Sequence, residues 1–134
     1  MQRVKPLVSL DTLRKLPKVE LHSHLTASFP RSAFKVLLEE KGLDSDISYL
    51  DSTVVKEVFT TTFENIRKGI THKKDLEYIS HHCFDAYYQD NVKYLEIRST
   101  PKSMADIDSV EYVQTIIDSI KKFQADVNDE MQIR

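Results

Sequence analysis

The chain has 134 residues, of which 40% are hydrophobic and 30% are charged, and its formal net charge is −2. These values are typical of one soluble globular domain, and they provide no basic surplus for binding nucleic acid. Cys83 is the only cysteine, which excludes an intrachain disulfide and a CxxC-type zinc site. No apolar run is long enough for a signal peptide or a membrane span, so we expect a cytoplasmic protein.

The chain begins with a predicted helix and a predicted strand. The pattern over 9–16 predicts a short helix that is capped by Ser9 or Asp11. The helix should end before Pro17, because the residue that precedes a proline is disfavoured in helical geometry. The next segment, KVELHSH over 18–24, is predicted to be a strand.

Two longer helices are predicted in the middle of the chain. Ser28 as the N-cap, apolar residues at helical spacing and Gly42 as the stop predict a helix over 28–42. A second helix is predicted over 51–70, although its β-branched residues weaken the pattern. Within it, we expect Thr60–Thr62 to bend or interrupt the helix.

The sequence pattern in the second half of the chain predicts a helix, a strand and a further helix. Apolar residues recur at helical spacing over 75–90 and over 109–126, and a strand separates these helices at 92–100. The final segment, 126–134, is predicted to lead into a further strand.

Strands that alternate with long helices favour parallel βα units. Two parallel strands do not make a stable sheet, because such strands are normally buried on both faces. We therefore predict an α/β fold, in which 1–134 is a single incomplete domain and the N-terminal part of a (β/α)8 barrel of the TIM type. About two βα units would be present, since a complete barrel needs about 250 residues. The alternative is a small three-layer domain.

Two histidines lie on the first predicted strand at alternate positions. Side chains alternate along a strand, so His22 and His24 should share one face with Glu20, while Val19 and Leu21 face the helices. Their Cα atoms would be about 6.6 Å apart, and their rings could converge on one cation. From the residues alone, the pair could be zinc ligands or simply two polar residues at the end of a strand.

Two stretches of the sequence resemble the adenosine deaminase family. LPKVELHSHL, at 16–25, resembles the opening strand of that family, and VKYLEIRSTPKSM, at 92–104, resembles the second strand of its adenosine deaminase-like branch. The resemblance covers nearly the whole chain from Leu16 onward. It implies a zinc-dependent metal hydrolase barrel that deaminates a 6-aminopurine nucleotide. The substrate implied is N6-methyl-AMP, converted to IMP, and the alternative is an adenosine deaminase that acts on the free nucleoside.

The resemblance implies roles for residues on the strand and on the helix that follows. His22 and His24 correspond to the paired zinc ligands of the first strand. Phe59 and Phe63 correspond to apolar residues that help to cover the purine. The alternative for the two phenylalanines is a helix face buried in the core.

Further substrate contacts are implied after each strand. Thr100 and Lys102 correspond to positions suited to a nucleotide phosphate, although both could be solvated loop residues. Thr26 stands where the family has an acidic or amide residue that contacts the sugar, and Ala27 stands where it has glycine. The shorter hydroxyl and the added methyl group should alter the contacts there.

Most of the catalytic apparatus that the resemblance implies has no counterpart in the sequence. The third zinc histidine, the glutamate proton donor, the catalytic histidine and the final aspartates would lie beyond Arg134. We therefore assign no catalytic residue, and we expect the isolated chain to be inactive and the complete protein to be a monomer with one zinc ion. The non-enzymatic alternative is a truncated fragment that binds through its sheet edge.

The remaining charged and histidine residues lead to two smaller predictions. Buried charges must pair, so Arg98 is predicted to form an ion pair with Glu20 or Glu96 inside the barrel. The other three histidines lie in a loop and on a helix, and we do not expect them to bind metal. They are His72, His81 and His82.

Overall fold

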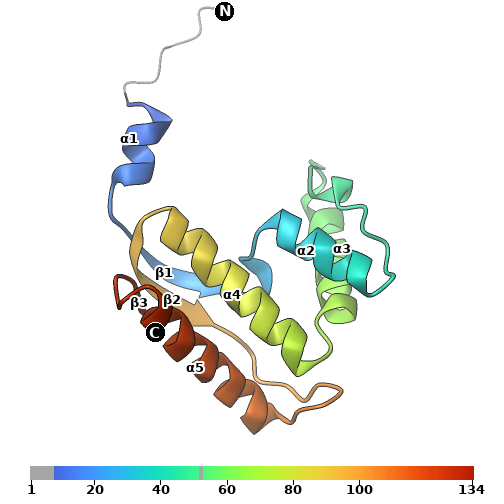
Figure 1. Ribbon diagram of the computed structural model, residues 1–134. Helices are drawn as coiled ribbons and strands as arrows, with labels where there is room; N and C mark the ends of the chain where they lie inside the picture. Colours follow the sequence, from blue (N-terminus) through green and yellow to red (C-terminus); the bar gives the residue numbers. More distant parts are fainter. Residues whose placement is uncertain (1–7, 52) are drawn as a thin grey trace, which may run out of the picture.

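Helices and strands alternate along the chain in the computed structural model, which describes residues 8–51 and 53–134. The helices and the two 3-10 turns are α1 (Leu10–Lys15), η1 (Leu25–Ala27), α2 (Arg31–Glu40), η2 (Ser48–Asp51), α3 (Val55–Gly69), α4 (Lys73–Gln89) and α5 (Ser109–Asp126). The strands are β1 (Lys18–His24), β2 (Val92–Arg98) and β3 (Gln132–Ile133) (Figure 1).

The described strands form one parallel sheet in the order β1-β2-β3. Glu20 pairs with Leu95 and His24 with Arg98, so the carboxyl ends of β1 and β2 lie side by side. On the other side of β2, Leu95 pairs with Ile133 of the short β3. The predicted lead into a third strand is therefore confirmed.

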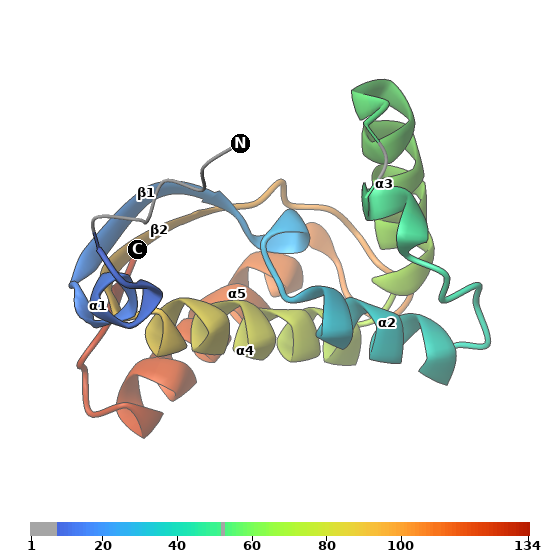
Figure 2. The ribbon, with the colours of Figure 1, turned by 90° about the horizontal axis from the view of Figure 1, so that it is seen from above.

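Helices α4 and α5 cover one face of the sheet, and no described helix lies on the other face (Figure 2). The core lies between these two layers and contains the fully buried side chains of Leu76, Ile79, Phe84 and Leu95. Cys83 is buried in the same core, and burial raises the pKa of its thiol to about 12. None of the described helices is long enough and apolar enough to span a lipid bilayer.

The predicted α/β class and the two βα units are confirmed by this arrangement. The alternative of a three-layer domain is wrong for the part of the chain that the structure describes, because its helices cover only one sheet face. The strand-to-helix order is also as predicted, with α5 spanning the predicted 109–126.

Two helix starts illustrate how local chemistry sets the element boundaries. Ser9 caps α1 as predicted, since its hydroxyl oxygen accepts from the backbone N–H of Thr12 at 3.1 Å. Ser28, in contrast, does not cap α2. Residues 25–27 form the 3-10 turn η1, and α2 begins at Arg31 with Pro30 as its N-cap.

Helix α3 is continuous, so the expected bend or interruption at the three threonines is wrong. The hydroxyl of Thr60 donates to the carbonyl of Lys56 at 2.9 Å, and that of Thr62 donates to the carbonyl of Val58 at 2.6 Å. These bonds use the threonine hydroxyls within the helix instead of in a competing turn. The predicted helix over 51–70 starts later than expected, because residues 48–51 form the separate turn η2.

The apolar residues of β1 correct another expectation. Val19 and Leu21 are 63% and 56% exposed instead of packing against the helices. Helix α4 contacts β2 and η1, which leaves the start of the edge strand β1 uncovered. The pairing register also shifts between Glu20 and Ser23, and among Val19, Leu21 and Ser23 only Ser23 is buried.

Candidate functional site

The two histidines lie at the carboxyl end of β1, on the side away from the helices. Ser23, between them, is buried, and its hydroxyl is 2.8 Å from the hydroxyl of Tyr87 on α4. Leu25, directly after the strand, is completely buried. With these residues anchored in the core, the alternate residues His22 and His24 share the opposite face of the strand, as predicted, and both side chains are exposed there.

The rings of the two histidines converge. His22 Nε2 and His24 Nε2 are 3.2 Å apart, and the ring centroids are 5.2 Å apart. Two imidazole nitrogens at tetrahedral positions about 2.0–2.1 Å from one zinc ion would be about 3.3 Å apart. The backbone N–H of His22 donates to Oε1 of Glu20 at 2.8 Å, which links this carboxylate to the backbone of the pair. The pair fits two ligands of a tetrahedral zinc ion.

A complete metal site is not assembled by the described residues. Over 8–51 and 53–134, no group of three or more histidine, cysteine, aspartate or glutamate side chains is placed to hold one ion. A catalytic zinc ion usually has three protein ligands, so the histidine pair accounts for two of them.

The predicted ion pair of Arg98 is wrong. Arg98 is exposed beside His24, and no ion pair of the described residues includes it. Oε1 of Glu96 instead accepts from the Tyr94 hydroxyl at 2.9 Å. The prediction assumed an enclosed barrel interior, whereas this sheet face is open and its charges remain hydrated.

Phe59 and Phe63 lie on α3, which rises past the carboxyl end of β1 on the open side of the sheet (Figure 2). Their side chains are 63% and 43% exposed, and their ring centroids are 4.5 Å apart. They do not belong to the described core, so the alternative of a buried helix face is wrong. Among the described aromatic contacts, neither ring touches the histidine pair.

Thr26 lies in η1, directly after the strand that carries the histidines, and its side chain is partly buried. Its neighbour Ala27 lines a pocket of about 250 Å³ together with Phe29 and Phe34, and Thr62 of α3 forms part of the same wall. Thr26 therefore lies at the carboxyl end of β1, next to a residue of this pocket, and its contact with the sugar stays a prediction.

Thr100 and Lys102 lie in the loop between β2 and α5. The backbone N–H of Ala105 donates to the carbonyl of Thr71 at 2.9 Å, so this loop is fixed to the junction of α3 and α4. Lys102 lines a shallow pocket of about 320 Å³ with Arg67 of α3, whereas Thr100 is exposed outside it. The sequence carries no local signal for Arg67, because it is far from Lys102 along the chain.

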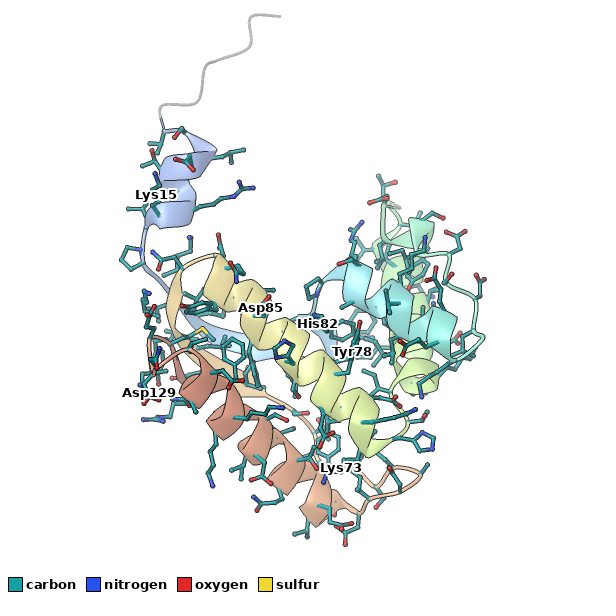
Figure 3. The ribbon with its side chains drawn as sticks, in the orientation of Figure 1. Lys15, Lys73, Tyr78, His82, Asp85 and Asp129 are labelled. Atoms are coloured by element: carbon teal, nitrogen blue, oxygen red, sulfur yellow. The ribbon has the colours of Figure 1, made fainter. Side chains whose placement is uncertain are left out.

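The other histidines lie away from the histidine pair of β1. His81 and His82 belong to α4, and His82 packs its ring on Tyr78 with centroids 4.4 Å apart. Tyr78 and His82 project from the same side of the helix (Figure 3). Burial, with a smaller contribution from His81, lowers the pKa of His82. That His72, His81 and His82 do not bind metal stays a prediction.

Known proteins resemble the chain in sequence. It is 31% identical over 121 residues to the N6-methyl-AMP deaminase-L of Xenopus laevis, covering 85% of this chain and 35% of that protein. It is 30% identical over 120 residues to the N6-methyl-AMP deaminase of Mus musculus, covering 84% of the chain and 33% of the relative. No family model matches the chain.

A solved structure agrees with these relatives. The crystal structure of arabidopsis ADAL complexed with GMP superposes on 93% of the chain with a TM-score of 0.74 at 27% identity. The chain is a homologue of the adenosine deaminase-like proteins. The chain covers 41% of the ADAL structure and spans about a third of the length of the curated relatives it matches.

Proposed function

We propose that this adenosine deaminase-like chain supplies two zinc ligands and part of the nucleotide pocket of a purine nucleotide deaminase. The observation that carries the proposal is the convergence of His22 Nε2 and His24 Nε2 to 3.2 Å at the carboxyl end of a parallel strand. The sequence similarity to proteins named as N6-methyl-AMP deaminases supports the reaction class.

The fold we propose for the complete protein is a (β/α)8 barrel. One sheet face carries α4 and α5 as an outer layer, and the other face is open and carries the histidines (Figure 2). In such barrels the active site lies at the carboxyl ends of the strands, which is where His22 and His24 lie. Residues 1–134 would then form one incomplete domain. That the protein is cytoplasmic and, when complete, monomeric stays a prediction.

His22 and His24 would hold the zinc ion through their Nε2 atoms. A bound zinc ion would supply Lewis-acid chemistry and activate water for hydrolysis. The buried Ser23 fixes the strand between the two ligands through its contact with Tyr87. Phe59 and Phe63 would offer apolar surface to the purine from α3, and Thr26 would offer a hydroxyl to the sugar.

The substrate we propose is N6-methyl-AMP, with free adenosine as the alternative. A crystal structure of arabidopsis ADAL carries GMP and another carries IMP, both nucleoside monophosphates. Lys102 adds a cation in the loop after β2, at the same end of the sheet as the histidines. A requirement for the phosphate group separates the two substrates, because adenosine lacks it.

Zinc titration of the chain tests the proposal. We expect one zinc ion to bind per chain, weakly because the described residues supply only two ligands. Replacing His22 or His24 by alanine should reduce the affinity by about tenfold or more, since a single imidazole remains. Isothermal titration calorimetry measures both the stoichiometry and the affinity.

His81→Ala is the matched control, because it removes an exposed imidazole from α4 instead of from β1. This variant should bind zinc as tightly as the unchanged chain. Equal affinities for His22→Ala, His24→Ala and the unchanged chain would show that the pair is not the zinc site.

A further inference from the structure

Strand β1 is irregular at the histidine pair. Between the residue pairs that Glu20 and Ser23 make with β2, β1 advances by three residues while β2 advances by two. The extra residue is a β-bulge in β1. Within the described sheet, neither Leu21 nor His22 has a paired residue on β2. The bulge therefore includes one of the two histidines.

The bulge lies where the two imidazole rings converge. In a regular strand, side chains at alternate positions stand roughly parallel, and their Cα atoms are about 6.6 Å apart. The ring centroids of His22 and His24 are 5.2 Å apart, their planes are tilted by 43°, and their Nε2 atoms are 3.2 Å apart. A β-bulge bends its strand and changes the direction of side chains, which is the change that this convergence requires.

The side chain of Glu20 contacts the backbone of the bulge. Its Oε1 accepts from the backbone N–H of His22 at 2.8 Å. A bulged residue is left unpaired in the ladder of the sheet, so the carboxylate supplies an acceptor at the irregular position. A hydrogen bond to a charged acceptor is stronger than one between neutral groups. No ion pair of the described residues includes Glu20, so this bond does not compete with a salt bridge there.

The residue that follows the bulge is fixed from the side of the helices. Ser23 is 3% exposed, and its hydroxyl is 2.8 Å from the hydroxyl of Tyr87 on α4. With Ser23 held in the core, the direction of the His22 ring depends on the backbone of the bulge. Glu20 is the side chain that holds this backbone.

The geometry does not favour Glu20 as a ligand of the metal itself. Over the described ranges 8–51 and 53–134, no third histidine, cysteine, aspartate or glutamate side chain is placed to share one ion with the histidine pair. The Oε1 atom of Glu20 is already used by the backbone N–H of His22. The carboxylate therefore acts on the pair through the backbone.

We propose that Glu20 is a positioning residue, which holds the bulge of β1 through the backbone N–H of His22 and thereby aims the His22 ring at His24. The role depends on the acceptor oxygen of Glu20 and not on its negative charge. The inference rests on the proposed function, because the two rings are the zinc ligands proposed there. Replacing groups that orient metal ligands typically weakens metal binding about 10–100-fold.

Glu20→Gln and Glu20→Met form a matched pair that tests this role. Both remove the charge and keep the length of the side chain, but only glutamine keeps an oxygen that can accept from the His22 N–H. Nuclear Overhauser effects between the two imidazole rings, measured without zinc, report the convergence. We expect these effects in the unchanged chain and in Glu20→Gln, and we expect their loss in Glu20→Met. The amide hydrogen of His22 should also exchange faster in Glu20→Met.

Glu96→Met is the control, because the Glu96 carboxylate accepts from the Tyr94 hydroxyl on β2 and not from the backbone of β1. It should leave the contact between the histidine rings unchanged. Ring contacts that persist in Glu20→Met, or that are absent from the unchanged chain, would overturn the proposal. Their loss in both Glu20 variants would also overturn it, because the charge and not the acceptor would then decide the geometry.

The same spectra report whether each variant is folded. The rings of Phe84 and Phe123 are in contact in the core, and nuclear Overhauser effects between them should persist in every variant. If Glu20→Met loses them, Glu20→Ala replaces it, with the same expected loss of the histidine contact. Loss of the core contact in both would overturn the proposal, because Glu20 would then support the whole fold.

Zinc titration separates this inference from the proposed function. Glu20→Met should bind zinc about tenfold more weakly than Glu20→Gln. If the unchanged chain binds no zinc while the ring contact still depends on Glu20, the proposed function fails and the positioning of the pair stands. If zinc binds as expected and Glu20→Met binds it as tightly as Glu20→Gln, the inference fails alone.

Discussion

Replacing Asp75 by alanine is expected to lower the free energy of unfolding by about 3 kcal/mol, the lower end of the range for breaking a buried ion pair. Asp75 is 2% exposed, and the Lys41 side chain that contacts it is 19% exposed. The substitution leaves the Lys41 ammonium group without its carboxylate. It also leaves the backbone N–H groups of Thr71 and His72 without their acceptor. Urea unfolding followed by circular dichroism measures the change.

The pH dependence of this contribution has a defined sign. Burial alone would raise the pKa of Asp75, but hydrogen bonds from Lys41, Thr71 and His72 outweigh burial and hold that pKa below its usual 3.8. The stabilisation is therefore complete above the unfolded-state pKa of about 3.9 and is lost as the pH falls through the lower folded-state pKa. The stability difference between the unchanged chain and Asp75→Ala should shrink only in that acid range.

Asp126→Ala is the control for both measurements. Asp126 is exposed at the end of α5, and its carboxylate takes part in no ion pair among the described residues. Its replacement should change the free energy of unfolding by less than about 0.5 kcal/mol. A similar loss for Asp75→Ala and Asp126→Ala would contradict the role of the buried Asp75 carboxylate.

Replacing Phe84 by alanine is expected to cost about 3–5 kcal/mol, because it opens a cavity in the core between the sheet and the helices. Phe84 is 0% exposed and packs edge-on against Phe123 of α5, with ring centroids 5.7 Å apart. This contact joins the two helices that cover the sheet. Thermal and urea unfolding measure the loss of stability.

The chain must remain folded for this loss to be measured, so Phe84→Leu is a milder second variant. It should cost clearly less than Phe84→Ala, because the leucine side chain fills much of the volume that alanine would leave empty. Phe59→Ala is the matched control, because Phe59 is 63% exposed. It should leave the stability nearly unchanged. If Phe59→Ala were as costly as Phe84→Ala, α3 would be packed into the core and Phe59 could not face a ligand.

Local patterns were sufficient to predict most elements and the histidine pair. The alternation of side chains along β1 places His22 and His24 on one face, and the burial of Ser23 between them keeps them there. Helix α5 follows its apolar repeat over Ser109–Asp126. These features depend on neighbours along the chain, which the sequence displays directly.

Features that depend on distant contacts could not be predicted in the same way. Arg67 and Lys102 line the same pocket, and the backbone N–H of Ala105 donates to the carbonyl of Thr71 beside it. A hydrogen bond between backbone atoms cannot be recognised from the pattern of side chains in the sequence. The exposure of Val19 and the free charge of Arg98 depend on which layers enclose the sheet. An expectation based on a closed barrel therefore fails for both residues in the described chain.

X-ray absorption spectroscopy of the chain with bound zinc tests the central claim most directly, because it counts the imidazole ligands. We predict two imidazole nitrogens at about 2.0–2.1 Å, with the remaining positions filled by light atoms from solvent. The count should stay at two when His72, His81 and His82 are all replaced by glutamine, and fall to none in His22→Ala/His24→Ala. A spectrum with two imidazoles that survives the loss of His22 and His24 would contradict the assignment of the zinc site to β1.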